Sequence, residues 1–357
     1  MTISDVRCHR LTASLHTPLV TALRSTSTVE TTVVEIVTAD GFRGFGEAPQ
    51  VWRVTGESLA GAEACISGPL TDVLLGRSAD DLHALLTETS TAVVGNHGAK
   101  AAVDVALHDL AARYRGVSLP RFLGTSRHRV RTDVTISAGD VDRLADDASK
   151  RVAEGFTVLK LKVGTDAASD VNRVRAVRAA VGPDVAIRLD ANQGWTVRQA
   201  VQVVRALEDA ATGVEFVEQP VAAADLEGLA AVTAAVDTPV MADESCFGLR
   251  DLSAIIERRA ADLVNIKLAK CGGLRVARAM LELAAAHGVG CIVGSMMEGP
   301  IGVGAAASLV AAYGTTATSD LDAAWWAARS PVIGGLVYDD ATVVLPDSPG
   351  LGIEGLA

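Results

Sequence analysis

Two lysines share one face of an apolar stretch, FTVLKLKVG, at residues 156–164. Side chains of a β-strand alternate between its faces, so Lys160 and Lys162 point one way while Leu159 and Leu161 point the other. Two like charges side by side on a mostly apolar strand cost free energy. A solvated edge strand could hold both, but the apolar neighbours and the central place of the run favour a functional site.

Carboxylates lie in three consecutive apolar runs that follow. Asp190 lies in VAIRLDAN, Glu218 in VEFVEQP and Asp243 in PVMADE. Three oxygen ligands without His or Cys suit Mg²⁺ or Mn²⁺ and not Zn²⁺. One acidic residue at a strand end often caps the next helix, but three at even spacing favour a metal site.

Most of the remaining runs also end in a polar or charged residue. These residues are Asn192, Glu244, Lys267, Glu298, Asp320 and Asp322. A barrel with a purely structural role would not need so many charges at its strand ends.

The runs must be positioned by a repeating fold. Between about residues 131 and 322, eight short apolar runs recur roughly every 25 residues, with Ala-rich helical stretches between them. Strand–helix units of this length predict a parallel sheet, and eight predict a closed barrel. Before them, VETTVVEIVTADGFRGFGEAP alternates around Asp40-Gly41 and predicts a hairpin in an α+β segment. The strand-like tail is expected to return to that segment.

Ring geometry relates the charged residues to one another. Active sites of such barrels lie at the carboxyl ends of the strands. Strands two and six are opposite in a ring of eight, so Lys162 and Lys267 would face each other with the metal between them. A substrate carboxylate at the metal would present its α-carbon between the two lysines. A lysine base at neutral pH needs a pKa about 2–3 units below 10.4, and Lys160 and the metal would lower it.

Composition excludes several classes of partner. The formal net charge of −11 argues against nucleic acid and anionic membranes. Five scattered cysteines without a CxxC pair fit a reducing compartment. The start MTISDVRCHR has no apolar region of a signal peptide, and glycines, Pro300 and Glu298 interrupt the apolar run at residues 288–318. We therefore expect a cytoplasmic enzyme.

The motifs together resemble one enzyme family. They are KLK at Lys160 and Lys162, DAN at Asp190, EQP at Glu218, DES at Asp243, NIKLAKCGG at Lys267, and AAVDVALHDL near the N-terminus. This set is similar to the muconate-lactonizing-enzyme subgroup of the enolase superfamily over nearly the whole chain. The resemblance implies an α/β fold, a modified (β/α)₇β TIM-type barrel with an α+β capping domain. The expected boundaries are 1–128 for the N-terminal part of the capping domain, 129–322 for the barrel and 323–357 for the returning segment.

The resemblance also implies roles for the charged residues. Mg²⁺, with Mn²⁺ as a substitute, would be held by Asp190, Glu218 and Asp243. Lys162 and Lys267 would form the acid/base pair. The expected supporting residues are Lys160, Asn192 and Glu244, and the expected substrate contacts are Arg24, Thr135, Lys160, Glu298, Asp320 and Asp322.

Strand eight separates the reactions found in the subgroup. Asp320 and Asp322 in SDLD resemble the Asp-x-Asp that holds the substrate ammonium in dipeptide epimerases. A dipeptide spans about 7 Å, so its carboxylate could meet the metal while its ammonium meets the aspartates. The alternative for Asp320 and Asp322 is an N-cap before AAWWAARS, a role that Asp322 could fill alone.

Two loops in the first domain would set the specificity. The segment TALR resembles that of L-Ala-D/L-Glu epimerases, in which the arginine, here Arg24, takes the acidic side chain. The second loop is PQVWRVTGES, at residues 49–58, and Trp52 and Arg53 make it bulkier than expected for the family. Gly299-Pro300, after Glu298, stands where the family is expected to have small polar residues.

Dipeptide epimerisation by two-base proton transfer is therefore the expected activity, and a homo-oligomer is expected because the family often assembles. The alternatives are an N-acylamino acid racemase or o-succinylbenzoate synthase, and then a muconate cycloisomerase. The substrate of a muconate cycloisomerase is a dianion, which the paired aspartates would repel. A non-catalytic barrel would have lost a lysine or a ligand, and none is missing.

Overall fold

The computed structural model describes residues 1–20 and 25–357, so the predicted substrate contact Arg24 lies outside the described residues. The chain begins with an antiparallel sheet in the order β1-β2-β3, formed by Ile3–Val20, Ser25–Thr38 and Arg43–Pro49. Val37 pairs with Arg43, and Gly41 has φ +88° in the turn between them. The predicted hairpin at Asp40-Gly41 is confirmed.

A group of helices follows this sheet, and α1, η1 and α4 pack against it. The helices are α1 (Leu59–Cys65), η1 (Ile66–Leu70), α2 (Thr71–Leu74), α3 (Leu82–Thr91), α4 (His97–Tyr114) and α5 (Leu119–Phe122). Helix α4 contains the AAVDVALHDL motif and is buried along most of its length. It approaches β3 closely because Gly44 and Gly46 have no side chain: a Cβ on Gly46 would lie 1.8 Å from the carbonyl oxygen of Ala102.

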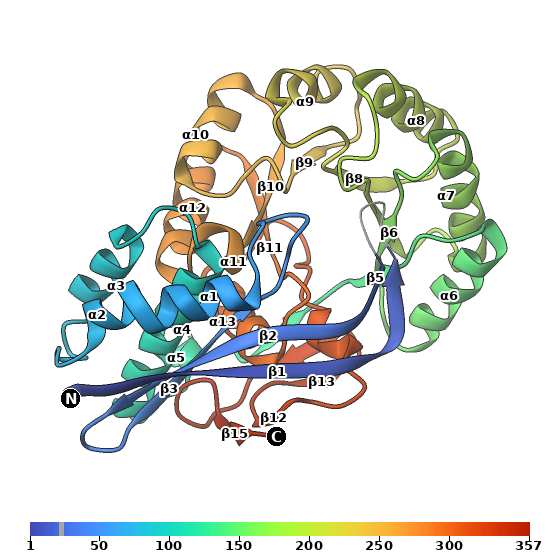
Figure 1. Cartoon of the computed structure of the whole chain (residues 1–357). Coiled ribbons are helices and arrows are strands. Elements are labelled where there is room, and N and C mark those ends of the chain that lie inside the picture. Colours follow the sequence, from blue (N-terminus) through green and yellow to red (C-terminus); the bar gives the residue numbers. More distant parts are fainter. Residues whose placement is uncertain (21–24) are drawn as a thin grey trace.

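Within the described residues, a second sheet contains seven parallel strands in the order β11-β10-β9-β8-β7-β6-β5. The strands are β5 (Val134–Ile136), β6 (Val158–Lys162), β7 (Ala186–Asp190), β8 (Val214–Glu218), β9 (Val240–Ala242), β10 (Leu263–Lys267) and β11 (Gly290–Gly294). The helices that follow form the outer layer of the barrel (Figure 1). They are α6 (Val141–Ala153), α7 (Ala167–Val181), α8 (Val197–Asp209), α9 (Leu226–Thr233), α10 (Leu249–Arg258), α12 (Leu274–Ala286) and α13 (Pro300–Tyr313). The short helix α11 (Leu268–Cys271) is buried between β10 and α12 and packs against α4.

The eighth strand is shorter than the sequence suggested. Ser319 forms a parallel bridge with Thr132, and Asp320 forms one with Gly294, so these two residues close the ring between β5 and β11. Hydroxyl groups replace part of the usual ladder, because the Thr132 Oγ1 accepts a hydrogen bond from the Leu321 amide at 2.9 Å. The barrel is therefore of the modified (β/α)₇β type, and the predicted fold is confirmed.

The C-terminal segment returns toward the first sheet. It contains η2 (Ala323–Trp326), β12 (Val332–Gly334), β13 (Val337–Asp339), β14 (Thr342–Val344) and β15 (Ile353–Leu356). Strand β14 pairs with β4 (Arg129–Arg131), and β12 pairs with β15. The Asp109 carboxylate on α4 accepts hydrogen bonds from the amides of Phe45 and Leu351, and Arg113 donates to the Ile353 carbonyl at 2.6 Å.

The first domain reaches the barrel mouth through the end of β1. The Val20 carbonyl accepts a hydrogen bond from the Ala138 amide at 2.9 Å, just beyond β5. Figure 1 shows β1 and β2 extending from the N-terminal sheet to the strands of the barrel. No helix among the described residues is both long and apolar enough to span a bilayer.

Candidate active site

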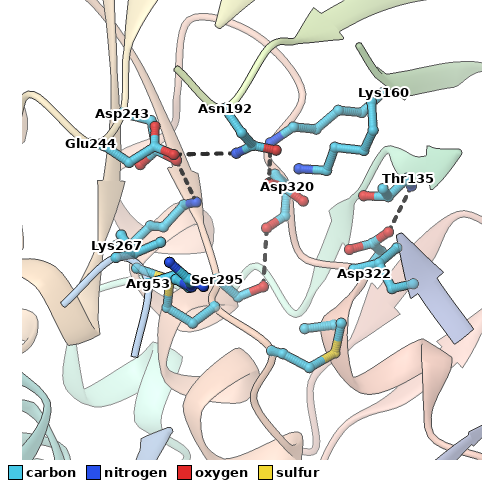
Figure 2. A pocket seen from close by; sticks show the side chains of 16 residues that line it. Arg53, Thr135, Lys160, Asn192, Asp243, Glu244, Lys267, Ser295, Asp320 and Asp322 are labelled. Atoms are coloured by element: carbon cyan, nitrogen blue, oxygen red, sulfur yellow. Dashed lines mark hydrogen bonds and ion pairs between the residues drawn. The ribbon is translucent and has the colours of Figure 1, made fainter. Parts of the chain in front are cut away.

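A pocket lies at the carboxyl ends of the barrel strands, beneath the first domain. Polar side chains from the barrel converge in it, as Figure 2 shows. They include Thr135, Lys160, Lys162, Asn192, Asp243, Glu244, Lys267, Ser295, Asp320 and Asp322. Leu19, Arg53 and Val54 line it from the first domain.

Strand pairing brings the predicted metal-binding residues to one edge of the sheet. Lys162 pairs with Asp190 in the β6–β7 register, and Asp190 pairs with Glu218 in the β7–β8 register. Glu218 pairs with Met241, two residues before Asp243. Lys267 ends β10, which is four strands from β6 in the sheet order. The structure therefore places three carboxylates on the strands between Lys162 and Lys267.

The lysines of β6 contact these carboxylates directly. The Lys162 Nζ donates a hydrogen bond to the Asp190 Oδ2 at 2.6 Å. The Lys160 Nζ donates to the Asp320 Oδ2 at 2.8 Å and lies 2.7 Å from the Glu218 Oε2. Burial alone would lower the pKa of Lys160, but attraction to Asp190, Asp320 and Glu218 raises it well above its usual value.

Two lysines contact Asp243. The Lys267 Nζ donates to its Oδ2 at 2.7 Å, and the Lys270 Nζ donates to its Oδ1 at 2.5 Å. Burial would lower the pKa of Lys267, but the Asp243 charge raises it above its usual value. At Lys267 the charge of Asp243 outweighs both burial and repulsion from Lys160. The lowered lysine pKa expected from the sequence depends on a bound cation as well as on Lys160, and it stays a prediction.

The four carboxyl groups divide into two kinds. Burial would raise the pKa of Asp190 and of Asp243, but their lysine partners hold both well below the usual range. Burial and the charge of Asp190 raise the pKa of Glu218 to about 7. Burial and Asp243 raise the pKa of Glu244 to about 7. This crowding of carboxylates favours a bound cation, because the nearby lysines do not offset burial and carboxylate repulsion at Glu218 and Glu244.

The oxygens of the cluster suit a hard divalent cation. In the part of the chain that the structure describes, no three acidic, His or Cys side chains form a preformed metal site, and lysine ammonium groups contact the carboxylates instead. Several buried oxygens nevertheless have no hydrogen-bond partner, namely the Asn192 Oδ1, Glu218 Oε2 and Glu244 Oε2. The Lys160 ammonium near the Glu218 Oε2 lies off the hydrogen-bonding direction, so that contact is an ion pair only. An all-oxygen donor set fits Mg²⁺ or Mn²⁺.

The two predicted supporting residues contact each other. The Asn192 side-chain Nδ2 donates a hydrogen bond to the Glu244 Oε1 at 3.3 Å, and the Asn192 backbone N–H donates one to the Asp190 Oδ1 at 2.9 Å. The backbone of Asn192 has φ +41°, a left-handed conformation that Asn tolerates better than most residues. Asn192 therefore connects the carboxylates of β7 and β9.

Sequence reasoning missed three residues behind the carboxylates. The Gln219 Oε1 accepts hydrogen bonds from the amides of Asp243 and Ser245. The Asn265 side chain donates to the Glu218 Oε1 at 2.8 Å, and Lys270 contacts Asp243. The position of Asn265, two residues before Lys267 on the same strand face, was the available signal. Lys270 had no such signal, because it follows the strand.

Asp320 and Asp322 both line the pocket. The Asp322 Oδ2 accepts hydrogen bonds from the Thr135 amide at 2.7 Å and from the Trp326 indole at 2.9 Å. It makes no capping hydrogen bond to the helical turn η2, so the capping alternative is wrong. Burial and Asp320 raise the pKa of Asp322 to about 6. Burial would raise the pKa of Asp320, but Lys160 holds it below its usual range.

Glu298 does not lie where the sequence suggested. It is buried outside the pocket lining, and its Oε1 accepts a hydrogen bond from the Met296 amide at 2.7 Å. Burial and the nearby Glu47 raise its pKa to about 8. The predicted substrate contact is therefore corrected: the chain turns after β11, so Met296 and Met297 face the pocket and Glu298 packs behind them.

Arg53 reaches the site from the second loop. It lines the pocket, and together with Met297 it also lines an adjoining pocket bordered by Ser25, Thr28 and Gln50. The neighbouring Trp52 is 62% exposed. The structure thus places an arginine of the first domain between the pocket at the strand ends and a second, polar one.

Comparison with known proteins identifies the family. Residues 3–124 match the N-terminal domain of the mandelate racemase/muconate lactonizing enzymes, and residues 143–355 match the enolase C-terminal domain-like family. An L-Ala-D/L-Glu epimerase of Clostridium acetobutylicum is 41% identical, over 100% of this chain and 99% of that protein.

Two solved structures have the same fold over the full chain. A substrate-liganded complex of the L-Ala-D/L-Glu epimerase from Bacillus subtilis is 42% identical with a TM-score of 0.97, covering 100% of both chains. A dipeptide epimerase from Enterococcus faecalis, complexed with Mg and L-Leu-L-Tyr, is 36% identical with a TM-score of 0.94, covering 99% of both. The chain belongs to the mandelate racemase/muconate lactonizing enzyme family of the enolase superfamily.

Proposed function

We propose that this protein is a Mg²⁺-dependent dipeptide epimerase that inverts the carbon next to the substrate carboxylate. The observation that carries the proposal is the placement of Lys162 and Lys267 four strands apart, with the carboxylates of Asp190, Glu218 and Asp243 on the strands between them. The similarity to dipeptide epimerases over the whole chain supports it.

Each lysine would serve one face of the α-carbon. The neutral amine of one lysine takes the α-proton, and the ammonium of the other delivers a proton to the opposite face. The two lysines end with their protonation states exchanged, so the same pair catalyses the reverse reaction. Such positioned acids and bases contribute about 10²–10⁴-fold to a rate.

Asp190, Glu218 and Asp243 would hold the cation. A divalent cation at these residues would neutralise the negative charge that the substrate carboxylate gains when the α-proton leaves. Lys160 would stay charged, because Asp190, Glu218 and Asp320 surround it. Its fixed charge would lie beside Lys162, because both lysines are on the same face of β6.

The aspartates of the last strand would recognise the substrate ammonium. Asp320 and Asp322 line the same pocket as both lysines. Asp322 is held by Thr135 and Trp326, so its carboxylate is already oriented before a substrate binds. Charge-assisted hydrogen bonds to an ammonium in such a buried site are among the stronger polar contacts.

We further propose that the carboxyl-terminal residue of the substrate is acidic, as in the substrates named for the Clostridium and Bacillus relatives. Arg24 stays the sequence-based prediction for the partner of that side chain. Arg53 is a described arginine at the pocket that could share the role.

A substrate panel tests the function. Purified protein with Mg²⁺ is incubated with L-Ala-L-Glu and with its N-acetyl derivative, and the epimers are separated by chiral chromatography. We expect L-Ala-D-Glu from the free dipeptide and a loss of at least about thirtyfold in kcat/KM for the blocked one. Turnover of neither substrate would reject the epimerase assignment.

An N-acylamino acid racemase is the second candidate, and one contact favours it. Asp320 already pairs with Lys160 at 2.8 Å, so a substrate without an ammonium would leave no unpaired charge there. The two candidates are separated by the double variant Asp320→Asn/Asp322→Asn. If the protein is a dipeptide epimerase, the double variant should lose kcat/KM for free dipeptides. If it is an N-acylamino acid racemase, the wild-type protein should already turn over N-succinylamino acids faster than free dipeptides.

We also propose a cytoplasmic homo-oligomer. The five cysteines are free, and burial raises the pKa of Cys246 and of Cys271 to about 12, so neither thiol is poised for disulfide exchange. These features suit a reducing compartment. Size-exclusion chromatography with light scattering would measure the oligomeric state, and a monomer at micromolar concentration would reject that part.

A further inference from the structure

Lys270 is a fourth lysine at the carboxylate cluster, and it lies outside the pocket lining. It belongs to the short helix α11 and is 1% exposed. Its ammonium donates hydrogen bonds to the Asp243 Oδ1 at 2.5 Å, to the Asp243 carbonyl at 2.5 Å and to the Asn265 carbonyl at 2.9 Å. Lys270 therefore contacts the carboxylate from behind.

The three contacts use all of the ammonium protons of Lys270. A lysine ammonium has three donors and no acceptor, so this group is fully satisfied by fixed protein atoms. Lys267 differs, because it lines the pocket and donates one hydrogen bond, to the Asp243 Oδ2. Of the two carboxylate oxygens, Oδ1 faces a lysine locked in the interior and Oδ2 faces the one at the pocket.

Lys270 also connects two neighbouring strands. Asp243 follows β9, and Asn265 lies in the middle of β10, so the contacts with both carbonyls fix the end of β9 against β10. The side chain of Asn265 in turn donates to the Glu218 Oε1 at 2.8 Å. Lys270 thus supports Asp243 directly and Glu218 through Asn265.

We propose that Lys270 is a positioning residue that holds Asp243 by its Oδ1, so that the Oδ2 is presented to the divalent cation. This inference rests on the proposed function, because it takes Asp243 as a cation ligand. It makes a prediction of definite sign. If Lys270 acted only as a nearby positive charge, it would repel the metal ion, so its removal would strengthen metal binding. If Lys270 orients the ligand Asp243, its removal should weaken metal binding.

Binding of Mn²⁺ to the substrate-free protein distinguishes the two roles. Free Mn²⁺ is measured by electron paramagnetic resonance during titration of the wild type, Lys270→Met and Lys270→Gln. We expect about 10–100-fold weaker binding by Lys270→Met. Lys270→Gln, whose amide keeps two donors, should lose less. Lys150→Met removes a lysine whose side chain is 64% exposed and should bind like the wild type.

Two further controls keep the outcomes separate. Thermal unfolding of each variant, followed by circular dichroism, shows whether it is folded at the titration temperature, and Lys270→Gln carries the test if Lys270→Met is not. Asp243→Asn tests the metal site itself. If Asp243→Asn binds Mn²⁺ like the wild type, the proposed metal site fails and this inference falls with it. If Asp243→Asn weakens binding but the folded Lys270 variants bind equally or more tightly than the wild type, only the role of Lys270 is overturned.

Discussion

Lys160, Lys162 and Lys267 all contact buried carboxylates at the strand ends, but their surroundings differ. Lys160 lies within 3.0 Å of three carboxylates, those of Asp190, Glu218 and Asp320. Lys162 and Lys267 each pair with one, Asp190 and Asp243 respectively. A lysine held by three anions is the least able to lose its proton. At the residue scale, this difference favours Lys160 as a fixed charge and the other two as the proton-transfer pair.

Removing either member of the pair should stop epimerisation. We expect Lys162→Ala and Lys267→Ala each to lower kcat by at least about 10²–10⁴-fold, because a positioned acid or base is lost. Each variant should still exchange the α-proton of one epimer with solvent through the lysine that remains. Chiral chromatography measures the first effect and deuterium exchange by NMR the second, with Lys150→Ala as the exposed control. Wild-type epimerisation by either variant would contradict the two-lysine assignment.

Arg53 should affect which dipeptide is preferred. Because its side chain lies at the junction of two pockets, Arg53→Met should lower kcat/KM for Ala-Glu about three- to tenfold more than for Ala-Leu. Arg24→Met is measured beside it, since Arg24 is the sequence-based prediction for the same role. Arg198→Met on the exposed side of α8 is the control. Equal losses for both dipeptides in Arg53→Met would make Arg53 irrelevant to the acidic side chain.

The positions of most site residues could be predicted from the alternation of side chains along the strands. The contacts that these residues make with one another could not. The strand ends brought Lys162, Asp190 and Asp243 to one edge of the sheet, because parallel strands present their carboxyl ends together. The support from Lys270 depends on a short helix after β10 that has no periodicity to detect. Glu298 was misplaced because the direction of a loop residue after a strand does not follow from alternation.

At the element scale, a carboxylate of the first domain binds the N-terminus of a barrel helix. The Glu47 side chain, on β3, accepts hydrogen bonds from the amides of Gly299 and Gly302 at 2.8 Å each. Helix N-termini have unpaired amides and favour negative charge. Glu298 lies next to this contact and is buried with it. Helix α13 is therefore held against the first domain by the side chain of Glu47, beside a second buried carboxyl group.

Glu298 should make stability depend on pH. Burial and Glu47 raise its pKa from 4.5 to about 8, and Lys267 opposes this. Its folded form holds a proton that the unfolded form has lost, so its stabilising contribution is complete below pH 4.5 and declines as the pH rises to about 8. We expect Glu298→Gln, which keeps the acceptor for Met296, to gain roughly 2–4 kcal/mol over the wild type between pH 5 and pH 8.

Urea unfolding at the two pH values measures this difference. Glu354→Gln, on an exposed residue, provides the matched control. A constant difference between Glu298→Gln and the wild type across the range would mean that Glu298 is ionised in the folded protein at pH 5.

At the scale of the whole molecule, the chain leaves the first domain, forms the barrel and returns. The return is fixed by hydrogen bonds from Leu351 to Asp109 and from Arg113 to the Ile353 carbonyl. These contacts support the predicted returning segment at 323–357, whose boundaries stay a prediction. The repeat of strands and helices predicted the barrel, whereas the reduced eighth strand depends on hydroxyl contacts that no periodicity reveals.

Cation binding should stabilise the whole molecule, because the carboxylates come together only when the barrel is folded. A ligand at 100 times its Kd stabilises the folded state by about 2.7 kcal/mol. We therefore expect Mg²⁺ to raise Tm by several degrees and EDTA to reverse the shift and abolish epimerisation. The Asp190→Asn variant should show little response. An equal shift in that variant would place the stabilising cation elsewhere.

The most direct test of the central claim follows hydrogen at the α-carbon during the first turnovers. Wild-type protein with Mg²⁺ is incubated in D₂O with L-Ala-L-Glu or L-Ala-D-Glu, and both epimers are examined by NMR and mass spectrometry. Because one lysine removes the proton and the other delivers a solvent-derived one, each product epimer should carry one deuterium at the α-carbon of its Glu residue from the first turnover. A product epimer that retains the original protium would contradict proton transfer by two facing lysines.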